Sequence, residues 1–77
     1  MKFVRVIDHR LYPRKAISEA RSAYKDYCAV CVEPLPSDCA RLTVTVLPKH
    51  AANGREVVLS FFNFVLDKAA EINLQDS

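Results

Sequence analysis

The longest apolar stretch of the chain runs from Arg55 to Asn73, with the sequence REVVLSFFNFVLDKAAEIN. At about 100° per residue, a helix would place most of its large apolar side chains on one broad arc and its polar side chains opposite. That arc consists of Val58, Phe61, Phe62, Val65, Leu66, Ala69 and Ile72. The apolar row is too short to cross a membrane. The stretch therefore predicts a helix that carries much of the core.

Phe64 departs from this pattern, because a regular helix would place it between Ser60, Lys68 and Glu71, away from the core. An exposed phenylalanine beside another apolar residue indicates a second apolar contact, although it can also be an isolated surface aromatic. We therefore predict a partner or self-association interface at this position. It would consist of Val57 and Phe64, with Asn63 and Asp67 as its polar rim.

The chain has 77 residues, enough for a single small domain spanning 1–77. A domain of this size buries only about 60% of the surface that its unfolded chain exposes, so a partner subunit would add to its stability. Apolar residues make up 51% of the chain and charged residues 26%, which is typical of a globular protein and not of a disordered one. A dimer or another homo-oligomer is therefore one expected state.

Three β-rich runs and a second helical run precede the long apolar stretch, and their order predicts the fold class. The expected elements are a strand at Phe3–Ile7, a helix at Arg14–Cys28, strands at Ala29–Glu33 and Arg41–Leu47, and the long helix. The Asn53-Gly54 pair indicates a turn before that helix. This order predicts an α+β fold, strand-helix-strand-strand-helix, with a three-stranded sheet and both helices packed on one face. A right-handed crossover would make the first two strands parallel.

Positive charge is concentrated at the start of the chain. The first helix and the turn before it carry a basic stripe made of Arg10, Arg14, Arg21 and Lys25. Such a stripe can attract an acidic peptide or a phosphate backbone. Nucleic-acid binding is the weaker alternative of the two, because Phe3 is the only aromatic residue in the predicted strands, whereas RNA-binding sheets expose several.

The cysteines and histidines give little indication of a catalytic or metal site. Cys28 and Cys31 form a Cys-x-x-Cys pair, and Cys39 and His50 could complete four zinc ligands, but these two are scattered where zinc sites usually show tight pairs. Thioredoxin-type pairs lie at a helix start, whereas this one is predicted at a helix end. We predict unmodified thiols, no metal and no cofactor, and we expect no enzymatic activity.

The N-terminal sequence MKFVRVIDHR lacks the apolar run and the small-residue cleavage site of a signal peptide. No stretch reaches the length of a membrane span. These features predict a cytoplasmic protein with reduced cysteines.

Several core and turn positions together resemble a known family. They are Tyr12-Pro13, Ala16-Ile17, Ala20, Asp26, Cys28, Val30, Glu33, Pro48-Lys49 and Phe61-x-Asn63-x-x-Leu66-Asp67. Over Leu11 to Asp67 the chain resembles HxsD, the small protein of the His-Xaa-Ser repeat peptide system. The resemblance implies an accessory protein that works beside radical SAM enzymes, which perform the maturation chemistry. In that family a charged helical segment usually continues past the Leu-Asp pair, whereas this chain stops at Ser77.

The leading hypothesis is therefore a non-enzymatic accessory or adaptor protein of a peptide-modification system. It would bind a partner enzyme or the precursor peptide. An exposed sheet edge could accept an extended peptide as an added strand, and the basic first helix would favour acidic residues in that peptide. The alternative is a small nucleic-acid-binding regulator that uses the same helix.

Overall fold

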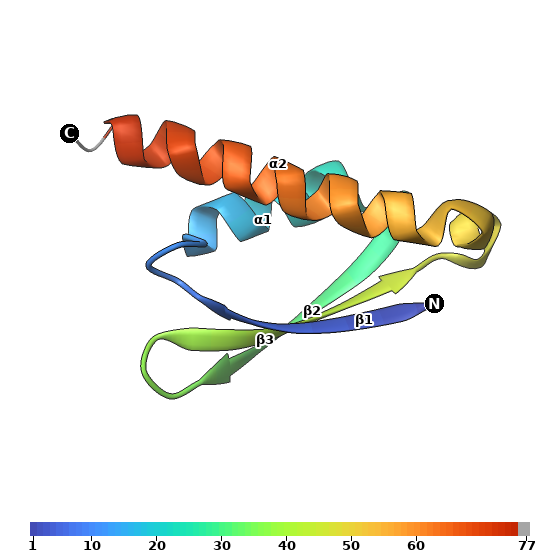
Figure 1. The fold of residues 1–77 in the computed structure, drawn as a ribbon, viewed down its shortest axis with the longest axis horizontal. Helices are drawn as coiled ribbons and strands as arrows, with labels where there is room; N and C mark the ends of the chain where they lie inside the picture. Colours follow the sequence, from blue (N-terminus) through green and yellow to red (C-terminus); the bar gives the residue numbers. More distant parts are fainter. Residues whose placement is uncertain (76–77) are drawn as a thin grey trace.

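A computed structural model describes residues 1–75 and shows a three-stranded antiparallel sheet with two helices on one of its faces (Figure 1). The elements are β1 (Lys2–Asp8), α1 (Arg14–Ala23), β2 (Cys28–Leu35), β3 (Cys39–Val46), the 3₁₀ helix η1 (Pro48–Asn53) and α2 (Gly54–Gln75). The predicted α+β class and the order strand-helix-strand-strand-helix are confirmed.

The strands lie in the order β1-β3-β2, so the last strand in the sequence occupies the centre of the sheet. β1 and β2 each pair with β3 in antiparallel fashion, which makes them parallel to each other, as the crossover argument predicted. Both outer strands consequently have one edge that is not paired in the sheet. A sheet edge of this kind presents backbone N–H and C=O groups to solvent or to a partner.

Alternation along the strands separates a packed face from an open one. Ala40, Leu42, Val44 and Val46 of β3 are buried beneath the helices, and the residues between them point to the open face. On that open face Val4 and Val6 are 59% and 58% exposed. Because no helix covers it, the open face is available to a partner over its whole width (Figure 1).

The predicted apolar arc of α2 forms the centre of the core, with Phe61 and Val65 fully buried and Val58, Phe62 and Ala69 nearly so. The prediction is wrong for one residue of the arc, because Leu66 is 46% exposed. The core contacts a narrower stripe of α2 than the predicted arc, and Leu66 lies at the outer edge of that arc. Leu59, two turns earlier on the same side of the helix, is likewise exposed, at 59%.

The helix predicted for Arg14–Cys28 ends earlier than its apolar periodicity indicates. α1 stops at Ala23, and Tyr24 caps it by donating its N–H to the carbonyl of Ala20. Cys28 then begins β2 as the partner of Val46. Residues 24–27 form a turn, so the β-branched strand that follows determines where the helix ends.

The Asn53-Gly54 pair lies where it was predicted, at the junction of η1 and α2. Gly54 has helical angles, φ −55° and ψ −44°, and is the first residue of α2. A side chain at this position would meet the end of the Met1 side chain, which is exposed and free to move aside. Glycine does not serve a left-handed turn here. Left-handed backbone occurs instead in the β2–β3 hairpin, at Ser37 (φ 64°) and Asp38 (φ 60°).

Candidate functional site: two sheet edges and the helices beside them

The structure corrects the prediction that Phe64 projects away from the core. Phe64 is half-buried and packs edge-on against Tyr24, with 5.7 Å between ring centroids. The Lys68 ammonium lies over its other side, 5.6 Å from the ring centroid. Phe64 is covered because α1 packs beside α2 and the chain following α1 brings Tyr24 to this flank, a contact between helices that the periodicity of α2 alone does not contain.

The other members of the predicted interface are therefore not grouped around an exposed aromatic. Asn63 and Asp67 are exposed, whereas Val57 is half-buried and packs against the core with Phe64. Their role in binding a partner stays a prediction, but its original basis, an exposed Phe64, no longer applies.

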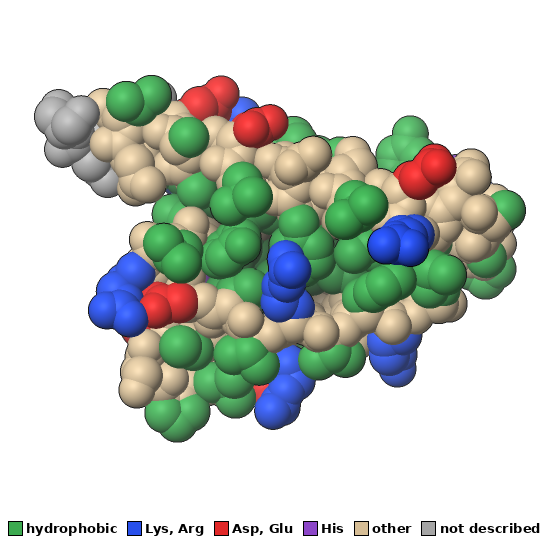
Figure 2. Space-filling model, viewed as in Figure 1, with side chains coloured by type: hydrophobic (Ala, Val, Ile, Leu, Met, Phe, Trp, Pro, Cys, Tyr) green, Lys and Arg blue, Asp and Glu red, His purple; other side chains and the backbone are tan. Residues whose placement is uncertain are grey.

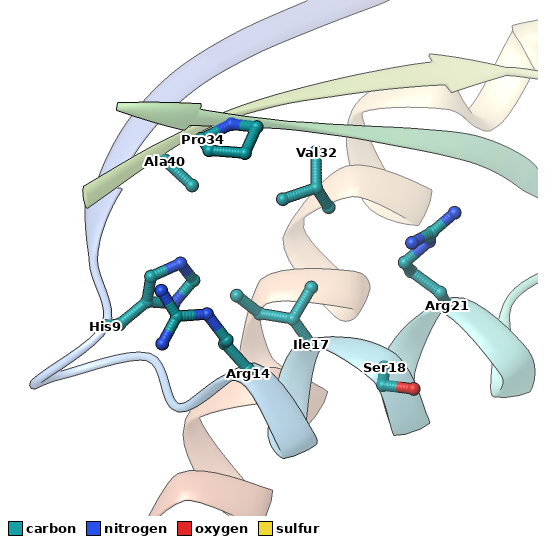
Figure 3. Close-up of a pocket in the computed structure, with 8 residues that line it drawn as sticks. All are labelled: His9, Arg14, Ile17, Ser18, Arg21, Val32, Pro34 and Ala40. Carbon is teal, nitrogen blue, oxygen red and sulfur yellow. The ribbon is translucent and has the colours of Figure 1, made fainter. Parts of the chain in front are cut away.

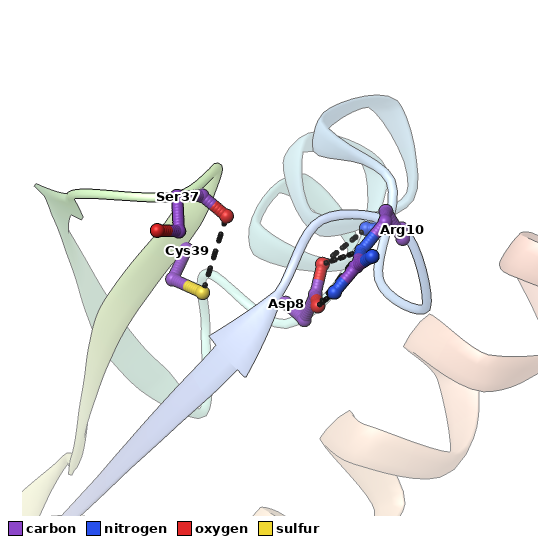
Figure 4. A network of polar contacts seen from close by, with 4 residues as sticks. All are labelled: Asp8, Arg10, Ser37 and Cys39. Atoms are coloured by element: carbon purple, nitrogen blue, oxygen red, sulfur yellow. Dashed lines mark hydrogen bonds and ion pairs between the residues drawn. The ribbon is translucent and has the colours of Figure 1, made fainter.

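The basic stripe is brought together only in part. Arg10 folds back on Asp8, donating from Nη2 to Oδ2 at 2.6 Å and from its backbone N–H to Oδ1 at 2.8 Å (Figure 4). Arg14 forms an ion pair with Asp38 at 2.9 Å. Within residues 1–75, Arg21 and Lys25 form no ion pair, so these two cations are available to an acidic ligand.

The contact with Arg10 lowers the pKa of the Asp8 carboxyl from 3.8 to about 2, mainly through the side-chain hydrogen bond. A lowered pKa in the folded state contributes stability that is present above pH 3.8 and is lost as the pH falls through about 2.

We expect the Asp8 carboxyl carbon to titrate near pH 2 in an NMR experiment. Arg10→Gln should raise that midpoint toward 3.8, whereas Arg14→Gln should leave it in place. A midpoint unaffected by Arg10→Gln would contradict the assignment.

Two adjoining pockets follow α1 along the edge of β2. One, of about 210 Å³, is lined by His9, Arg14, Ile17, Ser18, Arg21, Val32, Pro34 and Ala40 (Figure 3). The other, of about 460 Å³, is lined by Ser18, Arg21, Ser22, Lys25, Cys28, Ala29 and Val30. We call them together the α1/β2 groove. In Figure 3, Ile17 of α1 and Val32 of β2 point toward each other across the pocket, and Arg14 and Arg21 lie on either side of them. The groove combines a sheet edge, apolar surface and three cations, with no carboxylate among these lining residues.

Backbone hydrogen bonds show which groups of β2 face this groove. Leu47 donates its N–H to the carbonyl of Tyr27, so odd-numbered residues of β2 bond to β3. In an antiparallel pair the bonding direction alternates, and even-numbered residues therefore point their N–H and C=O outward. Pro34, which has no N–H, occupies one of these outward positions, as expected for proline in an edge strand. Val30 and Val32 thus present free backbone groups to the groove.

The cysteines are not brought together. Cys28 is buried under the helices, and burial raises the pKa of its thiol, whereas Cys31 is exposed on the opposite face of the sheet. Cys39 lies at the hairpin end of β3, where its thiol donates to the carbonyl of Ser37 at 3.6 Å (Figure 4). Among the described residues no group of three His, Cys, Asp or Glu side chains could hold a metal ion.

Comparisons with known proteins add no relative: no family model, no curated protein and no solved structure matches this chain. Within residues 1–75 no helix is both long and apolar enough to cross a membrane.

Proposed function

We propose that this protein is a non-enzymatic accessory protein that binds an extended, acidic peptide segment as an additional strand on the edge of β2. The observation that supports the proposal most directly is the juxtaposition in the α1/β2 groove: free backbone groups of Val30 and Val32 lie beside Arg14, Arg21 and Lys25. Added strands gain affinity from main-chain hydrogen bonds and specificity from pockets for alternate side chains.

The alternation of the added strand predicts the sequence of its ligand. Every second side chain would enter the α1/β2 groove, where Ile17 and Val32 favour a small apolar group and Arg21 and Lys25 favour a carboxylate at its rim. The intervening side chains would extend over the open face, beside the Glu33–Arg41 ion pair of 2.8 Å. The ligand is thus a peptide of about five to seven residues in which every second side chain faces the groove, and these groove-facing positions are in turn apolar and acidic.

The resemblance to HxsD suggests the context for such binding. A protein that holds the precursor peptide of a His-Xaa-Ser system, or a segment of the modifying enzyme, would present the substrate while the enzyme performs the chemistry. Binding by strand addition suits this task, because it recognises an extended backbone and leaves the rest of the precursor free.

Val30→Pro is the change that tests this proposal. Proline removes an outward N–H and no bond to β3, so we expect the fold to persist and affinity for the peptide to fall at least tenfold, the equivalent of about 1.4 kcal/mol. The measurement is a titration of ¹⁵N-labelled protein with a synthetic peptide in which valine and glutamate occupy every second position in turn and serine fills the positions between them. The largest amide shifts are expected at Val30 and Val32.

Two controls make the titration decisive. Val4→Pro makes the same change on the opposite edge and should leave peptide affinity unaltered, and a peptide with lysine in place of glutamate should bind weakly. Shifts confined to α1, with equal binding of Val30→Pro, would overturn strand addition. Tighter binding of a single-stranded oligonucleotide that weakens steeply with salt would favour the nucleic-acid alternative.

A further inference from the structure

The second free edge of the sheet, β1, differs in chemistry from the edge of β2. Met1 accepts a hydrogen bond from the N–H of Val46, and His9 donates its N–H to Asp38, so odd-numbered residues of β1 face β3. The even-numbered residues therefore point their backbone groups outward. Lys2, Val4 and Val6 each offer a free N–H and a free C=O. The Asp8 carbonyl, by contrast, is already occupied by Leu11 and Tyr12.

Apolar surface adjoins this edge in both layers of the molecule, interrupted by the cations Arg5 and Arg55. A pocket of about 350 Å³ between β1 and α2 is lined by Phe3, Val4, Arg5, Arg55, Val58, Leu59 and Phe62. Figure 2 shows hydrophobic side chains gathered between α2 and β1 on this side of the molecule. Leu59 and Leu66 lie one above the other on α2 at a spacing of seven residues, and they are 59% and 46% exposed. Below them, Val4 and Val6 are exposed on the strand itself.

We infer that this two-layered face, made of the edge of β1 and of Leu59 and Leu66 on α2, binds a second copy of the same chain. A single peptide strand could cover the edge of β1 but could not also cover the helix above it. A partner that covers both layers must itself have an edge strand to pair with β1 and a helix above that strand to contact α2. The chain offers this arrangement in α2 and β1, which run side by side along the long axis of the molecule (Figure 1).

The sequence of β1 suits pairing with itself about a two-fold axis at Val4. An antiparallel pair would place Val4 opposite its own copy and Lys2 opposite Val6, with the outward backbone groups of both strands in register. Arg5 would lie opposite Phe3 of the second copy and not opposite another arginine. Arg5 already stacks on Phe62, with its guanidinium carbon 4.7 Å from the ring centroid, which keeps its charge over an aromatic surface.

The dimensions of this face agree with a weak dimer. β1 has seven residues and is about 24 Å long at about 3.4 Å per residue, and the helical layer lies roughly 10 Å above it. A face of about 24 Å by 20 Å has an area of about 480 Å², which is smaller than the roughly 800 Å² per partner that standard interfaces bury. The product would be a six-stranded sheet with an α1/β2 groove at each end, so that each dimer could hold two peptides.

Val4→Pro tests the inference, because it removes one outward N–H at the centre of the edge and no bond to β3. Sedimentation velocity should give about twice the 8.7 kDa chain mass for the wild type and a single chain for Val4→Pro. Val30→Pro is the matched control and should remain dimeric. A second variant, Leu59→Glu, changes only an exposed helical side chain and should also yield monomers with unchanged helix content.

The outcomes separate this inference from the proposed function. A wild-type protein that stays monomeric at several hundred micromolar, or a dimer that survives both Val4→Pro and Leu59→Glu, would overturn the β1 interface without affecting peptide binding. Loss of the dimer in Val30→Pro alone would place self-association on β2 and would count against both proposals.

Discussion

Phe61→Ala is expected to destabilise the protein more than any other single truncation in the core. Phe61 is fully buried and packs edge-on against Tyr24 at 5.8 Å and against Phe62 at 5.3 Å between ring centroids. It is the side chain at which α1, α2 and the sheet meet. Truncating a buried phenylalanine costs about 3–5 kcal/mol, because the cavity closes only partly.

That cost is large against the stability of so small a domain. At about 0.05–0.15 kcal/mol per residue, a chain of 77 residues is stable by roughly 4–12 kcal/mol. We expect Phe61→Ala to be partly or wholly unfolded at 37 °C in a circular dichroism melt. Leu11→Ala is the control, because Leu11 is 67% exposed and should change the free energy of unfolding by less than about 0.5 kcal/mol. Equal stability of the two variants would show that Phe61 is not the centre of the core.

Phe64→Asp is the second substitution with a large expected effect. The sequence alone predicts that this change keeps the fold and abolishes an interface. The structure predicts that it removes the ring contact with Tyr24 and leaves a carboxylate at a half-buried position between the helices. We expect a loss of about 2–3 kcal/mol in the free energy of unfolding, from the lost apolar contact together with desolvation of the charge.

Asn63→Asp is the matched control, since it adds the same charge one residue earlier, at an exposed position. It should change stability by less than about 0.5 kcal/mol. Urea unfolding of both variants measures the difference directly. If Phe64→Asp keeps wild-type stability but sediments as a monomer, Phe64 belongs to a subunit interface after all.

The partner that each free sheet edge would bind depends on the neighbouring side chains as much as on the strand order. Both edges present backbone groups, and cations lie beside both: Arg14, Arg21 and Lys25 beside β2, and Arg5 and Arg55 beside β1. The α1/β2 groove offers an extended peptide a place beside β2, whereas the exposed Leu59 and Leu66 above β1 favour a second copy of the chain there. This division explains how one small sheet could bind a ligand and associate with itself without competition between the two.

The sequence predicted which basic side chains lie near the candidate site, but not which of them form ion pairs. The clustering of positive charge at the start of the chain predicted a basic stripe, of which Arg21 and Lys25 form no ion pair within residues 1–75. Nothing in the local sequence indicated that Arg10 would instead fold back onto Asp8, or that Asp38, twenty-four residues away, would pair with Arg14. Pairing between charges distant in sequence depends on the path of the chain, which periodicity does not contain.

The amino-acid sequence by itself determined the class of fold, the order of its elements and the residues at the centre of the core. These follow from local physics, because the 3.6-residue and two-residue periods of apolar side chains select helix or strand wherever they occur. The tertiary structure alone decided that β3 lies between β1 and β2, that α1 ends at Ala23 and that Tyr24 covers Phe64. Each of these depends on contacts between segments far apart in the chain, and so do the two free edges on which both proposals rest.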